Sequence, residues 1–281
     1  LPYIIRMKCM AIGDMGRGSQ GQYEVAKAMK ENYKKHKIQF VLGLGDNIYE
    51  NGATSVNDPQ FITKFETPYK LLPNDPWYMC LGNHDYGYTE DSLGFLDNSK
   101  TQIDYSRKSK KWTMPSSYYS FVKGNTQFFY LDTNLDRLSS SQIKAQLKFM
   151  KHKLDTSKKR WKVVVGHHTW RSVASHGNSE LDGFETFMNK LFKDTKPHVY
   201  MGGHDHCQSL IVKDKTSIVV SGSGADEYYI NEPITLSNMK DCRLDYFSPS
   251  QGYVILYMKP NELILEFYNK HNFKEYKHII R

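Results

Sequence analysis

The sequence predicts an α/β protein in which strands alternate with helices and further antiparallel strands are added towards the end of the chain. Short apolar runs alternate with amphipathic stretches over most of the sequence, the pattern of strands covered by helices. The last part instead contains strand-like runs joined by short turns. No repeat, low-complexity tract or flexible linker interrupts the pattern, so we expect a single domain over residues 1–281.

The elements follow from these patterns in chain order. Short runs rich in β-branched and aromatic residues predict strands at 7–12, 38–44, 77–81, 128–131, 161–165 and 198–201. Amphipathic stretches predict helices at 19–35, 140–154 and 182–193, and Ser19 is a favoured residue type to begin the first of them. Further strands are expected at 217–221, 252–258, 263–268 and 275–280.

Composition excludes several classes of protein. With 39% hydrophobic residues the chain can bury a sizeable core, which argues against disorder. No apolar run approaches the roughly 18 residues of a membrane-spanning helix, so we expect no transmembrane segment. The four cysteines are too few and too scattered for a disulfide framework; we expect them to be small buried residues, although a bridge between Cys207 and Cys242 remains open.

The net charge of +8 suggests either nucleic-acid binding or attraction of an anionic substrate. Lysines outnumber arginines by 30 to 8 and are interspersed with acidic residues. That pattern is typical of a solvated surface rather than of an arginine-rich grip on phosphates. Nucleic acid is therefore not the expected main partner.

Polar residues gather in five glycine-containing turns, each directly after an apolar run. The turns lie at 13–16, 45–49, 82–85, 166–168 and 203–206. One Gly-Asp turn means little, because both residues favour turns in general. Ligands of open α/β sheets bind outside the carboxyl ends of the strands, so five such turns in order predict one shared site.

The residues in these turns suit metal ions. Aspartate, asparagine, histidine and tyrosine bind hard or borderline cations, and so many donors favour two ions over one. Asp46 is the natural bridging residue. The expected ligands are Asp14, Tyr49 and His206 for one ion and Asn83, His167 and His204 for the other.

This ordered set resembles the metallophosphoesterases and, within them, the purple acid phosphatases of the small, tartrate-resistant or uteroferrin-like type. The similarity runs from Ile12 to about Val254 and includes stretches away from the turns, at 109–112, 129–133 and 221–224. It implies a four-layer αββα sandwich of two mixed β-sheets flanked by helices, in a single calcineurin-like domain.

Two departures from the wider superfamily indicate the subfamily and its metal. The wider class has a histidine where this chain has Gly16, whereas Tyr49, three residues after Asp46, resembles the purple acid phosphatase replacement. A phenol with a pKa near 10 deprotonates readily only on a strongly acidic ion. The resemblance therefore implies Fe(III) with a divalent partner, which is Fe, Zn or Mn.

The implied activity is that of an acid phosphatase, in which a metal-bound hydroxide attacks a phosphomonoester bound across both ions. His84 and His176 match the two outer histidines of the family, and we expect them to bind phosphate and to protonate the leaving group. Asn83 is also expected at the substrate. The residues do not decide how the roles divide between His84 and His176.

Other residues in the turns receive more ordinary roles. His167 is preferred over its neighbour as a ligand because the family ligand directly follows the glycine, so we expect His168 to be orienting or exposed. Asp85 and Asp205 are expected to support the turns. The loop after residue 133 is short and lacks the family's cysteine, which predicts an open site that needs no proteolytic activation. The segment 225–229 also departs from the family and is expected near the mouth of the site.

Two alternatives to the acid phosphatase stay open. One is a phosphodiesterase or nucleotide hydrolase that uses the same ions, and the other is a scaffold or anchor protein on a phosphatase fold. All expected ligand positions hold competent residues, which favours an enzyme. The sequence begins at Leu1 rather than methionine, compatible with a removed signal peptide, and the resemblance implies a secreted or an endolysosomal or vacuolar protein that acts on small phosphomonoesters.

Overall fold

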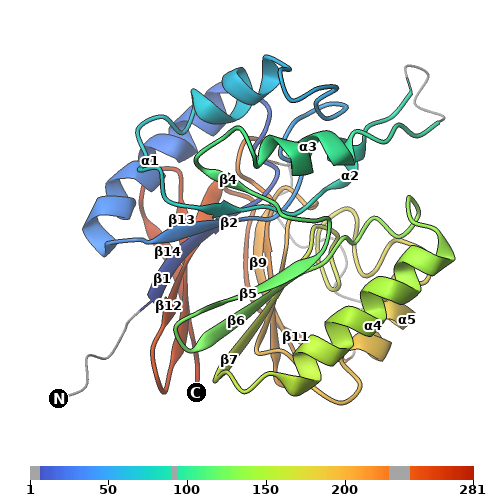
Figure 1. Ribbon diagram of the computed structural model, residues 1–281. Coiled ribbons are helices and arrows are strands. Elements are labelled where there is room, and N and C mark those ends of the chain that lie inside the picture. Colours follow the sequence, from blue (N-terminus) through green and yellow to red (C-terminus); the bar gives the residue numbers. More distant parts are fainter. Residues whose placement is uncertain (1–6, 90–93, 228–240) are drawn as a thin grey trace.

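The computed structural model describes residues 7–89, 94–227 and 241–281. Two seven-stranded sheets face each other (Figure 1). The first sheet has the order β14-β13-β12-β1-β2-β3-β4. Its strands are β1 (Met7–Ile12), β2 (Phe40–Gly43), β3 (Trp77–Tyr78), β4 (Trp112–Thr113), β12 (Gly252–Met258), β13 (Leu263–Asn269) and β14 (Lys274–Ile280).

Strand β1 lies at the centre of the first sheet. It pairs in parallel with β2, where Cys9 lies opposite Phe40, and antiparallel with β12, where Met7 lies opposite Met258. Strands β3 and β4 continue the parallel half, and β13 and β14 continue the antiparallel half. The sheet is therefore mixed, as the sequence predicts.

The second sheet has the order β11-β9-β10-β8-β7-β6-β5. Its strands are β5 (Tyr119–Lys123), β6 (Thr126–Tyr130), β7 (Trp161–Val165), β8 (Val199–Gly202), β9 (Gln208–Lys213), β10 (Thr216–Ser221) and β11 (Cys242–Ser248). Strands β6, β7, β8 and β10 form a parallel centre. Antiparallel β5 flanks it at one edge, and β9 and β11 flank it at the other.

Helices surround this pair of sheets, and the longer ones cover its outer faces. They are α1 (Gln20–His36), α2 (Asn83–Tyr86), α3 (Ser99–Tyr105), α4 (Ser140–Thr156) and α5 (Phe184–Leu191), together with a π-helical turn at Ile62–Glu66. Figure 1 shows α1 on one side of the molecule and α4 and α5 on the opposite side. Ser19 begins α1 as predicted, because its side chain accepts a hydrogen bond from the backbone N–H of Gln22.

Alternation along β6 shows how the layers form. Phe128 and Tyr130 belong to the core between the sheets, whereas Phe129 packs into a second core under α4 and α5. Because successive side chains of a strand point to opposite faces, β6 is covered on both sides. The expected four-layer sandwich of two mixed sheets and flanking helices is confirmed.

Several elements differ from the sequence prediction. Strands β4, β5, β9 and β11 were not expected, and they are short or flank the parallel strands of their sheet. Strand β3 ends at Tyr78 rather than at residue 81. Helix α5 begins at Phe184, two residues later than expected. Cys207 and Cys242 are both free thiols, so the bridge left open by the sequence does not form.

No helix within the described residues is long and apolar enough to cross a membrane.

A buried polar network follows β6 and leads towards the carboxyl ends of the strands. Asp132 accepts hydrogen bonds from Tyr86 Oη (2.6 Å) and Asn134 Nδ2 (2.9 Å). The side chain of Gln146 in α4 bonds to both the backbone N–H and the carbonyl of Asp132. Burial raises the pKa of Asp132 to about 6, although the hydrogen bonds from Tyr86 and Asn134 lower it.

We predict that Asp132→Asn changes how stability depends on pH. The folded-state pKa of Asp132, about 6, lies above the unfolded value of about 3.9, so its contribution is present below pH 4 and is lost as the pH rises through 6. Between pH 4 and pH 7, the wild type should lose roughly 2 kcal/mol relative to the variant. Urea unfolding of both proteins at equal metal loading measures this, and a difference that does not vary with pH would contradict it.

Candidate metal centre

The five turns converge at the carboxyl ends of the strands. Asp14 follows β1, Asp46 follows β2, and Asn83 opens α2 after β3. Backbone hydrogen bonds join the turns within each sheet, from Asp14 N to Gly45 O (2.9 Å) and from Gly203 N to His167 O (2.9 Å), and Gly13 N donates across to Ser221 O (2.9 Å) at the end of β10. The turns of both sheets therefore form one continuous surface.

Three of the predicted ligands form a first cluster. Tyr49 Oη lies 3.0 Å from Asp14 Oδ1 and 3.1 Å from His206 Nε2. The same nitrogen of His206 lies 3.4 Å from Asp14 Oδ1. Asp14 and Tyr49 are each 1% exposed, so these atoms face a common point away from bulk water.

Three other predicted ligands form a second cluster. His167 Nε2 lies 3.1 Å from Asn83 Oδ1 and 3.2 Å from His204 Nδ1. Asp46 lies between the clusters. Its Oδ2 is 3.4 Å from His167 Nε2 in the second cluster. In the first cluster, burial, then Asp14 and then Asp46 raise the pKa of Tyr49, so the Asp46 carboxylate also lies near that phenol. The geometry thus groups the residues as the sequence predicts.

The charge of the site favours a cation. Asp14 and Asp46 are buried, and within the described part of the chain neither forms an ion pair with a lysine or an arginine. Buried carboxylates are normally paired or bound to metal. Burial alone would lower the pKa of His167, but Asp46 and then Asp14 outweigh it and raise the pKa to about 10. The excess of negative charge and the nitrogen and oxygen donors fit metal ions.

Backbone strain places three of these side chains. Asp14, Asp46 and His204 have positive φ angles of 54°, 51° and 70°, a region that costs a non-glycine residue of the order of 1–3 kcal/mol. At His204 this conformation separates it from His206, two residues later. The two imidazoles consequently belong to different clusters.

Gly16 allows the first two turns to touch. A Cβ atom at this position would lie 1.8 Å from Asn47 O, so any side chain would force the turns apart. Tyr49 N donates a 3.0 Å hydrogen bond to Gly16 O. The glycine and the tyrosine that replace the superfamily histidine are therefore physically linked.

Neighbouring groups fix the orientation of the donors. His167 Nδ1 donates to Leu44 O (2.9 Å), so Nε2 is the nitrogen that faces the cluster and would offer its lone pair to a metal ion. Asp85 accepts hydrogen bonds from Asn47 N (2.9 Å) and Gly82 N (2.8 Å) and so holds two turns together. This supporting position agrees with the expectation for Asp85.

The two outer histidines lie at the edge of the site. His84 is 26% exposed, and its Nδ1 contacts Glu50 O at 2.6 Å. His176 is 37% exposed, and its ring lies 4.0 Å from that of His204. Both are open to solvent and next to predicted ligands.

The second half of the site decides between the two alternatives expected for His168 and supports the expectation for Asp205. His168 is not exposed: it is buried, and its Nδ1 lies 2.9 Å from Thr133 Oγ1. Asp205 accepts a hydrogen bond from His176 N (3.0 Å) and supports that loop.

The mouth of the site contains an arginine that sequence reasoning missed. The guanidinium of Arg17 lies 4.0 Å from the centre of the Tyr49 ring and forms ion pairs with Glu50 and Asp226. Part of segment 225–229 is therefore at the mouth, whereas Tyr228 and Tyr229 lie outside the described residues.

Glu180 was also missed. Its carboxylate contacts both His204 Nε2 and His176 Nδ1. In the sequence, its position four residues after His176 is only a weak signal of this contact, because no apolar pattern predicts the conformation of the loop.

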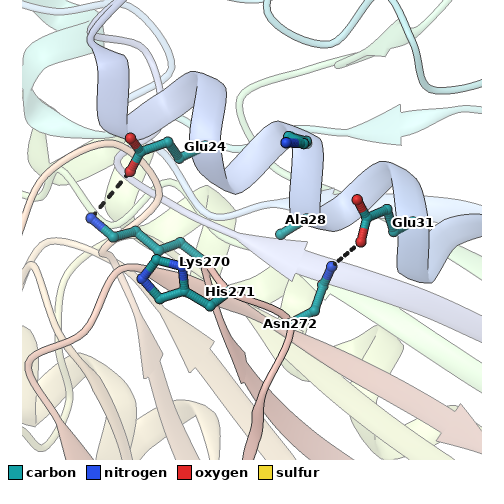
Figure 2. A pocket seen from close by; sticks show the side chains of 7 residues that line it. Glu24, Ala28, Glu31, Lys270, His271 and Asn272 are labelled. Atoms are coloured by element: carbon teal, nitrogen blue, oxygen red, sulfur yellow. Dashed lines mark hydrogen bonds and ion pairs between the residues drawn. The ribbon is translucent and has the colours of Figure 1, made fainter.

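A separate hollow of about 360 Å³ lies between α1 and the turn that joins β13 to β14 (Figure 2). Lys270 pairs with Glu24 at 3.2 Å, and Asn272 donates to Glu31 at 2.7 Å. These side chains pair with one another across the hollow and hold the turn against α1. No predicted ligand lines the hollow.

Comparison with known proteins agrees with this geometry. Residues 7–208 match the family of calcineurin-like phosphoesterases. Purple acid phosphatase 4 of Arabidopsis thaliana is 31% identical over 92% of this chain and 79% of its own length. The chain belongs to the purple acid phosphatases, within the calcineurin-like phosphoesterases. Tartrate-resistant acid phosphatase type 5 of Rattus norvegicus is 31% identical over 78% of this chain and 72% of its own length. This purple acid phosphatase is thus a homologue of acid phosphatases in a family of hydrolases.

Solved structures share the fold. Purple acid phosphatase PPD1 from yellow lupin seeds superposes with a TM-score of 0.77 at 17% identity, over 99% of this chain and 54% of that one. GAP50, described as the anchor in the inner membrane complex of Plasmodium, gives 0.79 at 21% identity over 98% of this chain and 89% of its own. At these identities the likeness shows the fold alone.

We predict that Gly16→Ala destabilises the protein by about 3 kcal/mol, the upper end of the usual cost of overpacking, because the new Cβ meets backbone. Metal content should fall as well, since the turns carrying Asp14 and Tyr49 must separate. Gly183→Ala is the matched control: nothing lies within 4 Å of its Cβ, and its positive φ should cost about 1–2 kcal/mol. Urea unfolding compares the two, and equal losses would argue against the contact between the turns.

Proposed function

We propose that this chain is a metal-dependent acid phosphatase that hydrolyses phosphomonoesters at a binuclear centre. The observation that carries the proposal is the pair of buried carboxylates, Asp14 and Asp46, flanked by two separate clusters of donors and lacking a lysine or arginine partner within the described residues. Homology to acid phosphatases supports the same reaction.

Each cluster is assigned one ion. Asp14, Tyr49 and His206 would hold Fe(III), since a phenolate favours a strongly acidic ion. Asn83, His167 and His204 would hold a divalent Fe, Zn or Mn, and Asp46 would contact both ions. When bound, such a pair of ions polarises the phosphoryl group and activates water.

The chain's own residues bind and orient the substrate. His84 and His176 border the solvent side of the clusters, where they bind the phosphate oxygens and supply a proton to the leaving oxygen. Asn83 Nδ2 donates to Tyr88 Oη (2.9 Å), which turns its Oδ1 towards His167. Tyr88 thus fixes the amide in the orientation that a ligand needs.

The open site supports hydrolysis of small substrates without prior proteolytic activation. The connection from β6 to α4 covers only residues 131–139, and both outer histidines keep exposed edges. We also infer that the protein works outside the cell or in an acidic endolysosomal or vacuolar compartment, as suits an acid phosphatase.

Three measurements on one preparation test the proposal. They are elemental analysis, turnover of nitrophenyl phosphate at pH 5, and turnover of bis-nitrophenyl phosphate. We expect about two ions per chain and faster hydrolysis of the monoester. Preference for the diester would instead indicate a phosphodiesterase, and a protein without metal or turnover would indicate a scaffold on this fold.

We predict that Asp46→Asn removes both metal and activity, because one carboxylate serves both clusters. Turnover should fall by more than about 100-fold, beyond the usual effect of losing an outer partner of a ligand. Asp214→Asn is a matched control, because Asp214 has nearly the same φ (53°) but is exposed in the turn after β9. Retained metal and turnover in Asp46→Asn would contradict the central position of Asp46.

We predict that Tyr49→Phe abolishes a visible charge-transfer band of the iron-loaded protein, because the band requires a phenolate on Fe(III). Tyr69→Phe, which alters a buried tyrosine packed on Trp77, should leave the spectrum unchanged. An unaltered band in Tyr49→Phe would exclude this residue as a ligand.

A further inference from the structure

Glu180 lies on the loop between β7 and α5, and its two oxygens contact different imidazoles. Oε1 accepts from His204 Nε2, and Oε2 contacts His176 Nδ1 at 2.6 Å. The rings of His176 and His204 lie 4.0 Å apart, inclined by 35°. One carboxylate therefore touches both a predicted ligand and a predicted phosphate-binding residue.

The contact with His204 decides which of its nitrogens can bind metal. Its Nδ1 faces His167 Nε2 at 3.2 Å, inside the second cluster. A neutral imidazole carries one proton, and a carboxylate on Nε2 holds the proton there. Nδ1 is left with its lone pair facing the cluster, as Leu44 O achieves for His167 from the opposite nitrogen.

The loop holds Glu180 in this place. His176 N donates to Asp205 Oδ1 (3.0 Å), and Thr169 Oγ1 donates to Gly177 O (2.8 Å). Ser179 adopts a φ of 48°, and its N–H donates to Thr169 O (3.1 Å). The backbone is therefore anchored on both sides of the turn that directs Glu180 inwards.

A cation held by Glu180, His168 and His204 is the competing interpretation, since their ligand atoms lie within 4.8 Å of one another. Thr133 Oγ1 already accepts hydrogen bonds from the backbone N–H groups of His167 and His168 (both 3.1 Å). Its own hydrogen is then directed to His168 Nδ1, so the proton of His168 sits on Nε2. A ring in that tautomer donates towards its surroundings and does not ligate through Nε2.

We propose that Glu180 is a positioning residue that links the two parts of the site: it fixes His204 as an Nδ1 ligand and holds the ring of His176 against it. This inference rests on the proposed function, because it takes His204 as a ligand and His176 as a contact of the substrate. Losing Glu180 should loosen both histidines at once.

The test uses Glu180→Gln, which keeps the shape of the side chain but turns an N–H group towards one of the two imidazoles. Asp182→Asn is the matched control, because Asp182 is an exposed carboxylate two residues further on. Calorimetric titration of the metal-free proteins with Zn²⁺ should show affinity at the second cluster reduced about 10–100-fold in Glu180→Gln and unchanged in the control. At saturating metal, kcat should stay about 10-fold or more below the wild type, because His176 is still misplaced, and Glu180→Asp should restore part of it.

A second measurement uses the wild type alone and so does not require any variant to fold. Long-range ¹⁵N–¹H spectra of the metal-free wild type should show the His204 proton on Nε2, and a proton on Nδ1 would overturn the inference. Wild-type Zn²⁺ affinity and kcat in Glu180→Gln would overturn it as well, as would three ions per wild-type chain with one lost in the variant. A wild type that binds no metal would instead refute the proposed function.

Discussion

The structure depends on placing two carboxylates, Asp14 and Asp46, where they are shielded from water and where, within the described residues, they pair with imidazoles but with no lysine or arginine. Such an arrangement is unfavourable until a cation arrives. The turns that carry these carboxylates are strained as well: Asp14 and Asp46 have positive φ angles, and the contact between the first two turns tolerates only glycine at position 16. The rigid sheets beneath the turns are what make this strain sustainable.

The two sheets contribute unequally to the site. The first supplies the oxygen donors Asp14, Asp46 and Asn83 from neighbouring parallel strands, and the second supplies the histidines after β7 and β8. Packing of one sheet on the other therefore sets the distance between acids and imidazoles. A core mutation far from the turns can disturb the metal centre without touching a ligand.

The sequence was sufficient to predict the fold class, the turns and the grouping of the proposed ligands into two clusters, because each turn directly follows a strong apolar run. The same argument could not find β4, β5, β9 and β11, whose short or half-polar sequences acquire their conformation from a neighbouring strand. It also could not place Glu180, because that residue reaches His204 through the strained turn at Ser179. The burial of His168 depends likewise on a contact with Thr133, from another strand.

The pairing of β1 with β12 affects how the protein can be made. Every proposed ligand lies before residue 207, yet the strand that carries Asp14 is bordered on one side by residues 252–258. During synthesis, the ribosome must therefore release these later residues before the central strand gains its second neighbour. Completion of the proposed metal centre is accordingly a late event, and a nascent chain that stalls earlier would expose an unfinished sheet edge beside its acidic turns.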